Sequence, residues 1–288
     1  MRRAAIRLFG FLLILYLAVC IVLYALQTSM IFPGRSTQGQ RQAVVPPSRS
    51  GDYELVMLTK ASGTRIVTAF GKAMSRDGTI LPDAPSRPMI LLFYGNGMCL
   101  ADAMVWLRDF RKLGANVMIP DYAGYGMSGG QPSEQSFCQT ADACWEYLVS
   151  RPDIDKSKII AAGVSIGGAV AIDLAARKPA YALATFSTFT SMPDMARDLF
   201  PWLPTSLLLK HRFESESKIR QIKVPIFIAH GTHDQIIPFP MSERLRKAAG
   251  GPVTYVTAET DHNDLFELAG DELLDALGRF IDSLKSSQ

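Results

Sequence analysis

The chain has 288 residues, of which 48% are hydrophobic and 20% charged, a balance that excludes a disordered protein and fits one large α/β domain with an appendage. Its formal net charge of +3 is small, and part of it lies at the N-terminus, so the sequence shows no basic face for nucleic acid. The four cysteines form no CxxC pair, and we interpret them as small apolar residues.

The first element is an uncharged apolar run over residues 8–26, which follows a basic stub at residues 1–7. At about 1.5 Å of rise per residue, this run can cross the roughly 30 Å hydrocarbon core of a bilayer. A cleaved signal peptide is the alternative, but Tyr24-Ala25-Leu26-Gln27 is a poor cleavage site. We predict an uncleaved single-pass anchor, with the stub cytoplasmic and the folded domain on the non-cytoplasmic (periplasmic, extracellular or lumenal) side.

A polar connector over residues 27–51 leads to the folded domain at 52–288, which opens with two alternating segments. Residues 53–59 and 64–74 alternate apolar and polar side chains around a short turn and predict an antiparallel hairpin. The continuous apolar run at 89–93 is typical of a strand covered on both faces.

Strands and helices then alternate to the end of the chain. The pattern predicts helices over 101–113, 133–149, 168–176 and 265–284, and strands over 116–120, 158–162, 181–186, 224–229 and 253–257. This alternation indicates a mostly parallel central sheet flanked by helices.

The segment Gly163-Val164-Ser165-Ile166-Gly167 lies between a predicted strand and a predicted helix. A Gly-x-Ser-x-Gly in that position is the nucleophile elbow of the α/β-hydrolase fold, in which the serine occupies a sharp, strained turn. Ser165 is therefore the candidate nucleophile. A serine hydroxyl also needs a base and an acid, which in this fold follow in the order Ser, acid, His.

His262 follows the last predicted strand and precedes the closing helix, where the general base is required. Asp234 follows the strand at 224–229 and is the preferred acid, with Asp261 and Asp264 as alternatives. The spacing of His230, His233 and Asp234 also permits a metal site, but no third ligand cluster accompanies it. We predict neither a metal nor a cofactor.

The oxyanion of an acyl-transfer reaction needs two N–H donors, which we assign to the backbones of Ile166 and Asn96. Asn96 belongs to the loop Tyr94-Gly95-Asn96-Gly97 after the strand at 89–93. Residues 188–220 form an apolar insertion that we expect to make a small cap over the site. Its candidate pocket residues, together with Tyr94, are Met192, Met195, Phe200 and Trp202, although these side chains are also suited to packing against helices.

Taken in order, these motifs resemble the BEM46-like α/β-hydrolases, the group that includes the ABHD13- and ABHD17-like proteins. The resemblance rests on Gly-Asn-Gly at 95–97, Asp-Tyr-Ala-Gly-Tyr-Gly-Met-Ser-Gly at 121–129, Gly-Val-Ser-Ile-Gly-Gly at 163–168, His-Gly-Thr-His-Asp-Gln-Ile-Ile-Pro at 230–238 and Asp-His-Asn-Asp at 261–264. One departure is Tyr94, where the group usually has histidine, so the hydrogen bonds of that loop must differ.

The resemblance implies a serine hydrolase of esters or thioesters, with a small-molecule or acylated substrate; in relatives the substrates include acyl-proteins and lipid-like molecules. Two other functions compete with it. A peptidase of the prolyl-oligopeptidase type shares this domain, but it usually carries a β-propeller for which the chain has no room. A catalytically inactive, membrane-tethered binding module is the second alternative, against which the intact set of Ser165, Asp234 and His262 argues.

Overall fold

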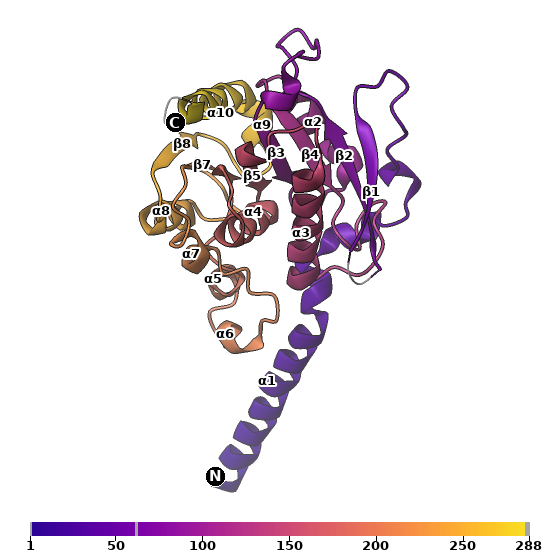
Figure 1. Ribbon diagram of the computed structural model, residues 1–288. Coiled ribbons are helices and arrows are strands. Elements are labelled where there is room, and N and C mark those ends of the chain that lie inside the picture. Colours follow the sequence, from indigo (N-terminus) through magenta and orange to yellow (C-terminus); the bar gives the residue numbers. More distant parts are fainter. Residues whose placement is uncertain (1, 61–62, 286–288) are drawn as a thin grey trace.

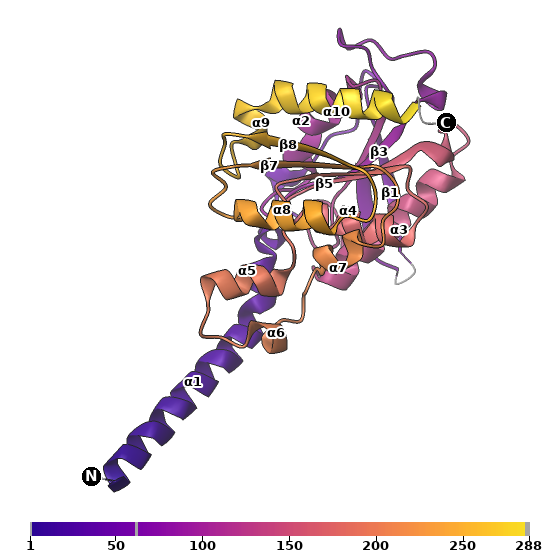
Figure 2. The same ribbon diagram turned by 90° about the vertical axis from the view of Figure 1, so that its left-hand side faces the viewer.

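The computed structural model describes residues 2–60 and 63–285 and consists of an eight-stranded sheet between two layers of helices, from which one long helix extends (Figure 1, Figure 2). The strand order is β1-β2-β4-β3-β5-β6-β7-β8; β2 is antiparallel to both of its neighbours, and the pairs from β4 to β8 are parallel. The strands are β1 (Glu54–Thr59), β2 (Arg65–Gly71), β3 (Met89–Phe93), β4 (Asn116–Pro120), β5 (Ile159–Val164), β6 (Ala182–Phe186), β7 (Ile226–Gly231) and β8 (Val253–Ala258). The predicted mostly parallel sheet is confirmed.

Helices cover both faces of this sheet, because its central strands are apolar on both sides. Every residue of β3, β4, β5, β6 and β7 is buried. Figure 2 shows α2, α9 and α10 on one face, and α3, α4 and α8 on the other. The bounds are α2 (Leu100–Arg111), α3 (Glu134–Ser150), α4 (Ile166–Arg177), α8 (Phe239–Ala248), α9 (Leu265–Leu268) and α10 (Gly270–Lys285).

Two helices at the C-terminal end differ from the sequence prediction. Helix α8 was not predicted because its buried stripe is narrow, consisting of Met241, Ser242 and Leu245 among charged residues. The closing helix is divided into α9 and α10, with Ala269 between them outside helical geometry and Gly270 beginning the second part. Glycine at that position lowers helix propensity and favours the break.

Helix α1 (Arg2–Ile31) is one continuous helix, longer at both ends than the predicted apolar run. Only 6% of its most apolar window is buried, so it is not a core helix, and its length and composition suit a membrane span. The segment after α1 packs on the domain instead of forming a free connector. Phe32 is fully buried, with ring contacts to Phe137 and His211, and Ala43 and Val45 are also buried.

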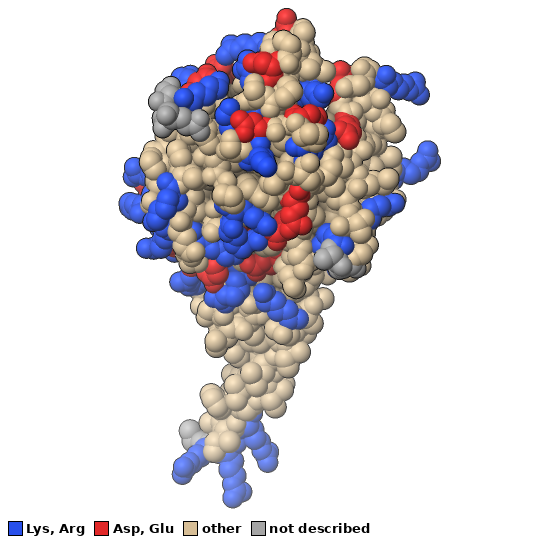
Figure 3. Space-filling view, viewed as in Figure 1, with Lys and Arg blue, Asp and Glu red and all other residues tan. Residues whose placement is uncertain are grey.

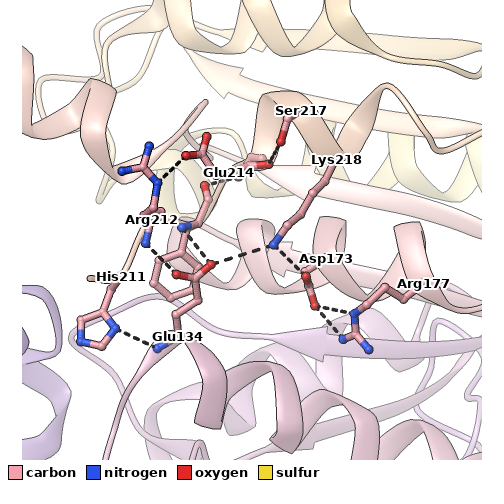
Figure 4. A network of polar contacts seen from close by, with 10 residues as sticks. Glu134, Asp173, Arg177, His211, Arg212, Glu214, Ser217 and Lys218 are labelled. Carbon is pink, nitrogen blue, oxygen red and sulfur yellow. Dashed lines mark hydrogen bonds and ion pairs between the residues drawn. The ribbon is translucent and has the colours of Figure 1, made fainter. Parts of the chain in front are cut away.

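The cap lies between β6 and β7 and contains α5 (Met192–Leu199), α6 (Thr205–Leu208) and α7 (Ser215–Ile219). Figure 4 shows the polar network that fastens its end to the sheet-covering helices. Glu134, the first residue of α3, accepts hydrogen bonds from the backbone N–H groups of Arg212 (2.6 Å) and Phe213 (3.0 Å). Lys218 in α7 donates to Asp173 in α4 (2.8 Å). From this anchorage α5 and α6 extend toward α1 (Figure 1).

Candidate active site

Ser165 occupies the turn between β5 and α4 in a strained backbone conformation, with φ 56° and ψ −122°. Such a conformation costs on the order of 1–3 kcal/mol for a residue with a Cβ, and the surrounding structure must impose it. The Ser165 N–H donates to the Phe186 carbonyl, and the Ser165 carbonyl accepts from the Thr188 hydroxyl, both at 2.8 Å. A Cβ at Gly163 would lie 2.1 Å from the Gly167 carbonyl oxygen, so the turn requires glycine there.

Ser165, His262 and Asp234 form one hydrogen-bonded line. Ser165 Oγ lies 3.1 Å from His262 Nε2, and His262 Nδ1 lies 2.7 Å from Asp234 Oδ2. The Asp234 side chain is fully buried and that of His262 is 10% exposed. Because a carboxylate only accepts, Nδ1 carries the proton and Nε2 is free to accept the serine proton. The structure thus brings together the three residues selected from the sequence.

The alternative acids are placed differently. Asp261 Oδ1 accepts from the backbone N–H groups of Gln235 (2.9 Å) and of His262 itself (2.6 Å), so this carboxylate binds the backbone and leaves the imidazole to Asp234. Asp264 is the N-cap residue of α9. Asp234 is further held by the N–H groups of residues 236 and 237, which donate to its Oδ1 at 3.0 and 2.7 Å.

His230 is buried beside Asp234 and supports the turn. Its Nε2 donates to the Ile237 carbonyl (2.9 Å), and burial lowers the pKa of His230 below its usual 6.5. Across the described ranges 2–60 and 63–285, no three His, Cys, Asp or Glu side chains form a group able to hold a metal ion.

Both residues assigned as oxyanion donors line the cleft that contains Ser165. Ile166 begins α4, where the first N–H groups of a helix have no partner within the helix. The Asn96 side chain holds its loop in place: its amide donates to the Ile31 carbonyl (2.5 Å), and its oxygen accepts from the Tyr125 hydroxyl (2.9 Å). Neither Asn96 contact was visible in the sequence.

Tyr94, predicted as a pocket residue, instead belongs to the core. Its side chain is fully buried and its hydroxyl donates to Asp121 Oδ1 (2.9 Å), while the Tyr122 hydroxyl donates to the Tyr94 carbonyl (2.9 Å). Desolvation raises the pKa of Asp121 to about 6, against hydrogen bonds from the N–H groups of Met127 and Leu100. Tyr94 and Tyr122 therefore support the loop that follows β3.

A cleft of about 1690 Å³ contains Ser165 and His262 and extends along the cap and α1 on one side and along α2, α9 and α10 on the other. The cap residues Met192, Met195 and Phe200 line it, as predicted. Trp202 does not; its ring packs against Tyr16 of α1, with 6.3 Å between ring centroids. A further set of lining residues was not predicted, namely Leu23, Tyr24, Gln27 and Met30 of α1, Trp106 of α2 and Phe266 of α9. The sequence offered one indication that α1 contacts the domain, which is Gln27, the first strongly polar residue after the apolar run.

The sheet, its flanking helices and the strained serine after β5 define an α/β-hydrolase. The model of the dienelactone hydrolase family matches residues 125–255, and that of the Chlamydia CHLPS protein matches residues 61–182. An esterase of Pyrococcus furiosus has the same fold, with a TM-score of 0.66 at 16% identity over 84% of this chain and 96% of its own. Est1E from Butyrivibrio proteoclasticus aligns with a TM-score of 0.63 at 16% identity, over 81% of this chain and 99% of its own.

Sequence relatives identify the family more closely. Protein bem46 of Schizosaccharomyces pombe is 34% identical over 76% of this chain and 73% of its own. The α/β-hydrolase domain-containing protein 17B of Xenopus laevis is 32% identical over 81% of this chain and 77% of its own. An uncharacterized protein of Mycobacterium tuberculosis is 34% identical over 84% of this chain and 87% of its own. The chain belongs to the BEM46-like family of α/β-hydrolases.

Proposed function

We propose that the protein is a membrane-anchored serine hydrolase that cleaves carboxylic esters or thioesters through an acyl-enzyme. The observation that carries this proposal is the continuous line from Ser165 through His262 to Asp234, with contacts of 3.1 and 2.7 Å. These are hydrogen-bond distances suited to proton transfer from a nucleophile to its base. The esterases among the structural neighbours agree with this class of chemistry at the level of fold.

In the proposed mechanism, Ser165 attacks the substrate carbonyl while His262 Nε2 takes its proton and Asp234 stabilises the resulting imidazolium. The backbone N–H groups of Ile166 and Asn96 hold the oxyanion of the tetrahedral intermediate. His262 then gives the proton to the departing alcohol or thiol, which leaves Ser165 acylated. A water molecule activated by His262 hydrolyses the acyl-enzyme by the reverse sequence of proton transfers.

The proposal places the protein in a membrane through α1, with residues 8–26 crossing the bilayer and 1–7 in the cytoplasm. Two observations support an uncleaved anchor: α1 is largely exposed, and Gln27 near its end is 5% exposed and bonded to the cap. The hydrolase domain then lies on the non-cytoplasmic side. A reporter fused after residue 288 tests this topology, because activity confined to the cytoplasm would reverse it.

The nucleophile is tested with Ser165→Ala. We expect this variant to lose both the hydrolysis of p-nitrophenyl acyl esters and labelling by a fluorophosphonate probe. Ser128→Ala is the matched control, because Ser128 is the second serine of a glycine-rich loop but bonds only to the backbone of Asp121 and Val67. Labelling that persists in Ser165→Ala would show that Ser165 is not the nucleophile. A wild-type protein that the probe does not label would favour the catalytically inactive binding module.

A further inference from the structure

The wall of the cleft is shared between the cap and the membrane helix. Leu23, Gln27 and Met30 of α1 and Met195 and Leu208 of the cap line the cleft that contains Ser165. We propose that this cleft opens into the adjoining bilayer leaflet alongside the wall that α1 and the cap form together, and that the acyl chain of a bilayer-resident substrate enters it there. This inference rests on the proposed function, and it adds the route and the physical state of the substrate.

The cap is fixed to α1 by hydrogen bonds that involve both ends of one side-chain amide. Gln27 Nε2 donates to the Leu208 carbonyl (3.1 Å), and Gln27 Oε1 accepts from the Lys210 N–H (2.7 Å). Thr28 and His211 are hydrogen-bonded one residue further along (3.2 Å). Because the amide is buried and its partners are backbone groups, the cap and the helix form one wall.

The tip of the cap lies beside the apolar part of α1. The Tyr16 hydroxyl donates to the Trp202 carbonyl (3.1 Å), and the two rings are in edge contact. Tyr16 is eleven residues before Gln27, which is about 16 Å along a helix. If residues 8–26 cross the hydrocarbon core, Tyr16 lies near its middle, and Trp202 lies at the same depth, at the inner end of the leaflet next to the domain.

The exposed side chains of the cap tip suit hydrocarbon. Leu199, Trp202 and Leu207 are 69%, 54% and 84% exposed, and residues 199–209 contain no charged side chain. The first charge after this stretch is Lys210, whose ammonium group lies 4.0 Å from the centre of the Tyr24 ring. An aromatic ring and a cation at one level are typical of the boundary between lipid and water.

The distribution of charged side chains supports the same position for the boundary between lipid and water. On the face seen in Figure 3, lysines and arginines gather at the free end of α1, a stretch without charge follows, and charges of both signs cover the body of the domain. Residues 199–209 of the cap likewise carry no charged side chain. An exposed apolar surface rimmed by charges marks a contact with a membrane or with another protein, and its continuity with the apolar helix α1 favours the membrane.

This arrangement has a consequence for the substrate. An acyl chain that entered through water would first have to leave the bilayer, at a cost that grows with each methylene group. Entry from the leaflet, along the wall formed by α1 and the cap, avoids that step because the chain passes from one apolar environment to another. Long acyl chains in the leaflet are therefore the expected substrates, and the ester or thioester group reaches Ser165 last.

The first test uses the full-length protein in phosphatidylcholine vesicles with two esters of one alcohol, 4-methylumbelliferyl palmitate dissolved in the bilayer and the water-soluble acetate. The measured quantity is the ratio of palmitate to acetate hydrolysis. Leu207→Glu places a charge at the cap tip, outside the residues that line the cleft, and should lower the ratio at least fivefold. Met57→Glu is the matched control, because Met57 is 70% exposed on β1, and the ratio should not change.

The second test does not depend on catalysis. Spin-labelled lipids should quench the fluorescence of Trp202, measured as the difference between wild type and Trp202→Phe in the same vesicles. A Trp202 signal quenched only by a water-soluble quencher overturns the lipid-facing cap, and so does a ratio that Leu207→Glu leaves unchanged. Neither of these two results contradicts the proposed serine hydrolase activity. A wild-type protein that cleaves neither ester and is not labelled by the fluorophosphonate probe overturns both proposals.

Discussion

The side-chain amide of Asn96 donates a hydrogen bond to the backbone carbonyl of Ile31, the last residue of α1, at 2.5 Å. The carbonyl groups in the last turn of a helix have no partner within the helix, so this acceptor is available because α1 ends there. One asparagine thus links the end of α1 to the loop that we propose holds the oxyanion. The position of α1 and the geometry of the reaction centre are therefore mechanically connected.

Asn96→Ala should lower kcat on a p-nitrophenyl ester by about 10- to 100-fold with little change in KM. The backbone donor remains in this variant, but the loop loses its bonds to Ile31 and Tyr125 and is no longer held in place. Steady-state kinetics separate the two constants. Labelling by the fluorophosphonate probe should slow in parallel, and an unaltered kcat would mean that the backbone alone positions the loop.

Gly34→Ala should destabilise the protein, because a Cβ at this position would lie 2.2 Å from Tyr125 Cε2 and 2.6 Å from the Asn96 carbonyl oxygen. Overpacking of this kind costs about 1–3 kcal/mol, which we expect to appear as a lower melting temperature together with reduced kcat. Gly270→Ala is the control, since a Cβ there meets no atom within 4 Å. Equal melting temperatures for the two variants would contradict the close packing of residue 34 on the loop.

Asp234→Asn should reduce kcat by on the order of 10³-fold or more while the protein still binds substrate. The substitution removes the carboxylate that fixes the proton on His262 Nδ1, so the imidazole loses the tautomer that accepts from Ser165. Asp261→Asn should retain most activity, because Asp261 accepts only backbone N–H bonds, which an amide oxygen can also accept. A reversal of these two effects would assign the acid to Asp261.

His230→Gln should weaken the dependence of the melting temperature on pH. Burial lowers the pKa of His230 from 6.5, so the folded state favours the neutral imidazole. That contribution is complete above pH 6.5 and is lost as the pH falls through the lowered pKa, with a slope of at most about 1.4 kcal/mol per pH unit. The wild-type melting temperature should therefore fall below pH 6.5 more steeply than that of the variant, which keeps a donor for Ile237.

Burial also lowers the pKa of His211, helped by the nearby Lys210, so a residual slope of the same sign should remain in His230→Gln. Melting curves of both proteins between pH 7.5 and 5 in one detergent make the comparison. Identical slopes would show that His230 does not change its protonation on unfolding in this range.

The strands and the three aligned side chains were predictable because each depends on a short stretch of sequence. β3 and β4 were predicted with their observed bounds, since a strand buried on both faces is an unbroken apolar run. Ser165, Asp234 and His262 follow the ends of β5, β7 and β8, and parallel strands bring such ends to one edge of the sheet. Tyr94 was misplaced because a residue at a strand end can point into the core as well as into a cleft.

The part played by α1 in the cleft was not predictable, because it depends on contacts between distant segments. Gln27 and Leu208 are 181 residues apart, and neither stretch has a pattern that selects the other. Trp202 has an apolar ring wherever it lies, and only the fold decides that it packs on Tyr16 and not in the cleft. Helix α8 was missed for a local reason, the narrowness of its buried stripe.

The Gln27 contacts also bear on how the protein is made. The Leu208 and Lys210 groups that bind the Gln27 amide are synthesised 181 and 183 residues after it. In the proposed topology, α1 enters the bilayer before the cap is complete, and the cap assembles on a helix already in place. A chain without α1 would lack the Gln27 side chain that binds residues 208 and 210, so the assembly of this wall of the cleft depends on α1.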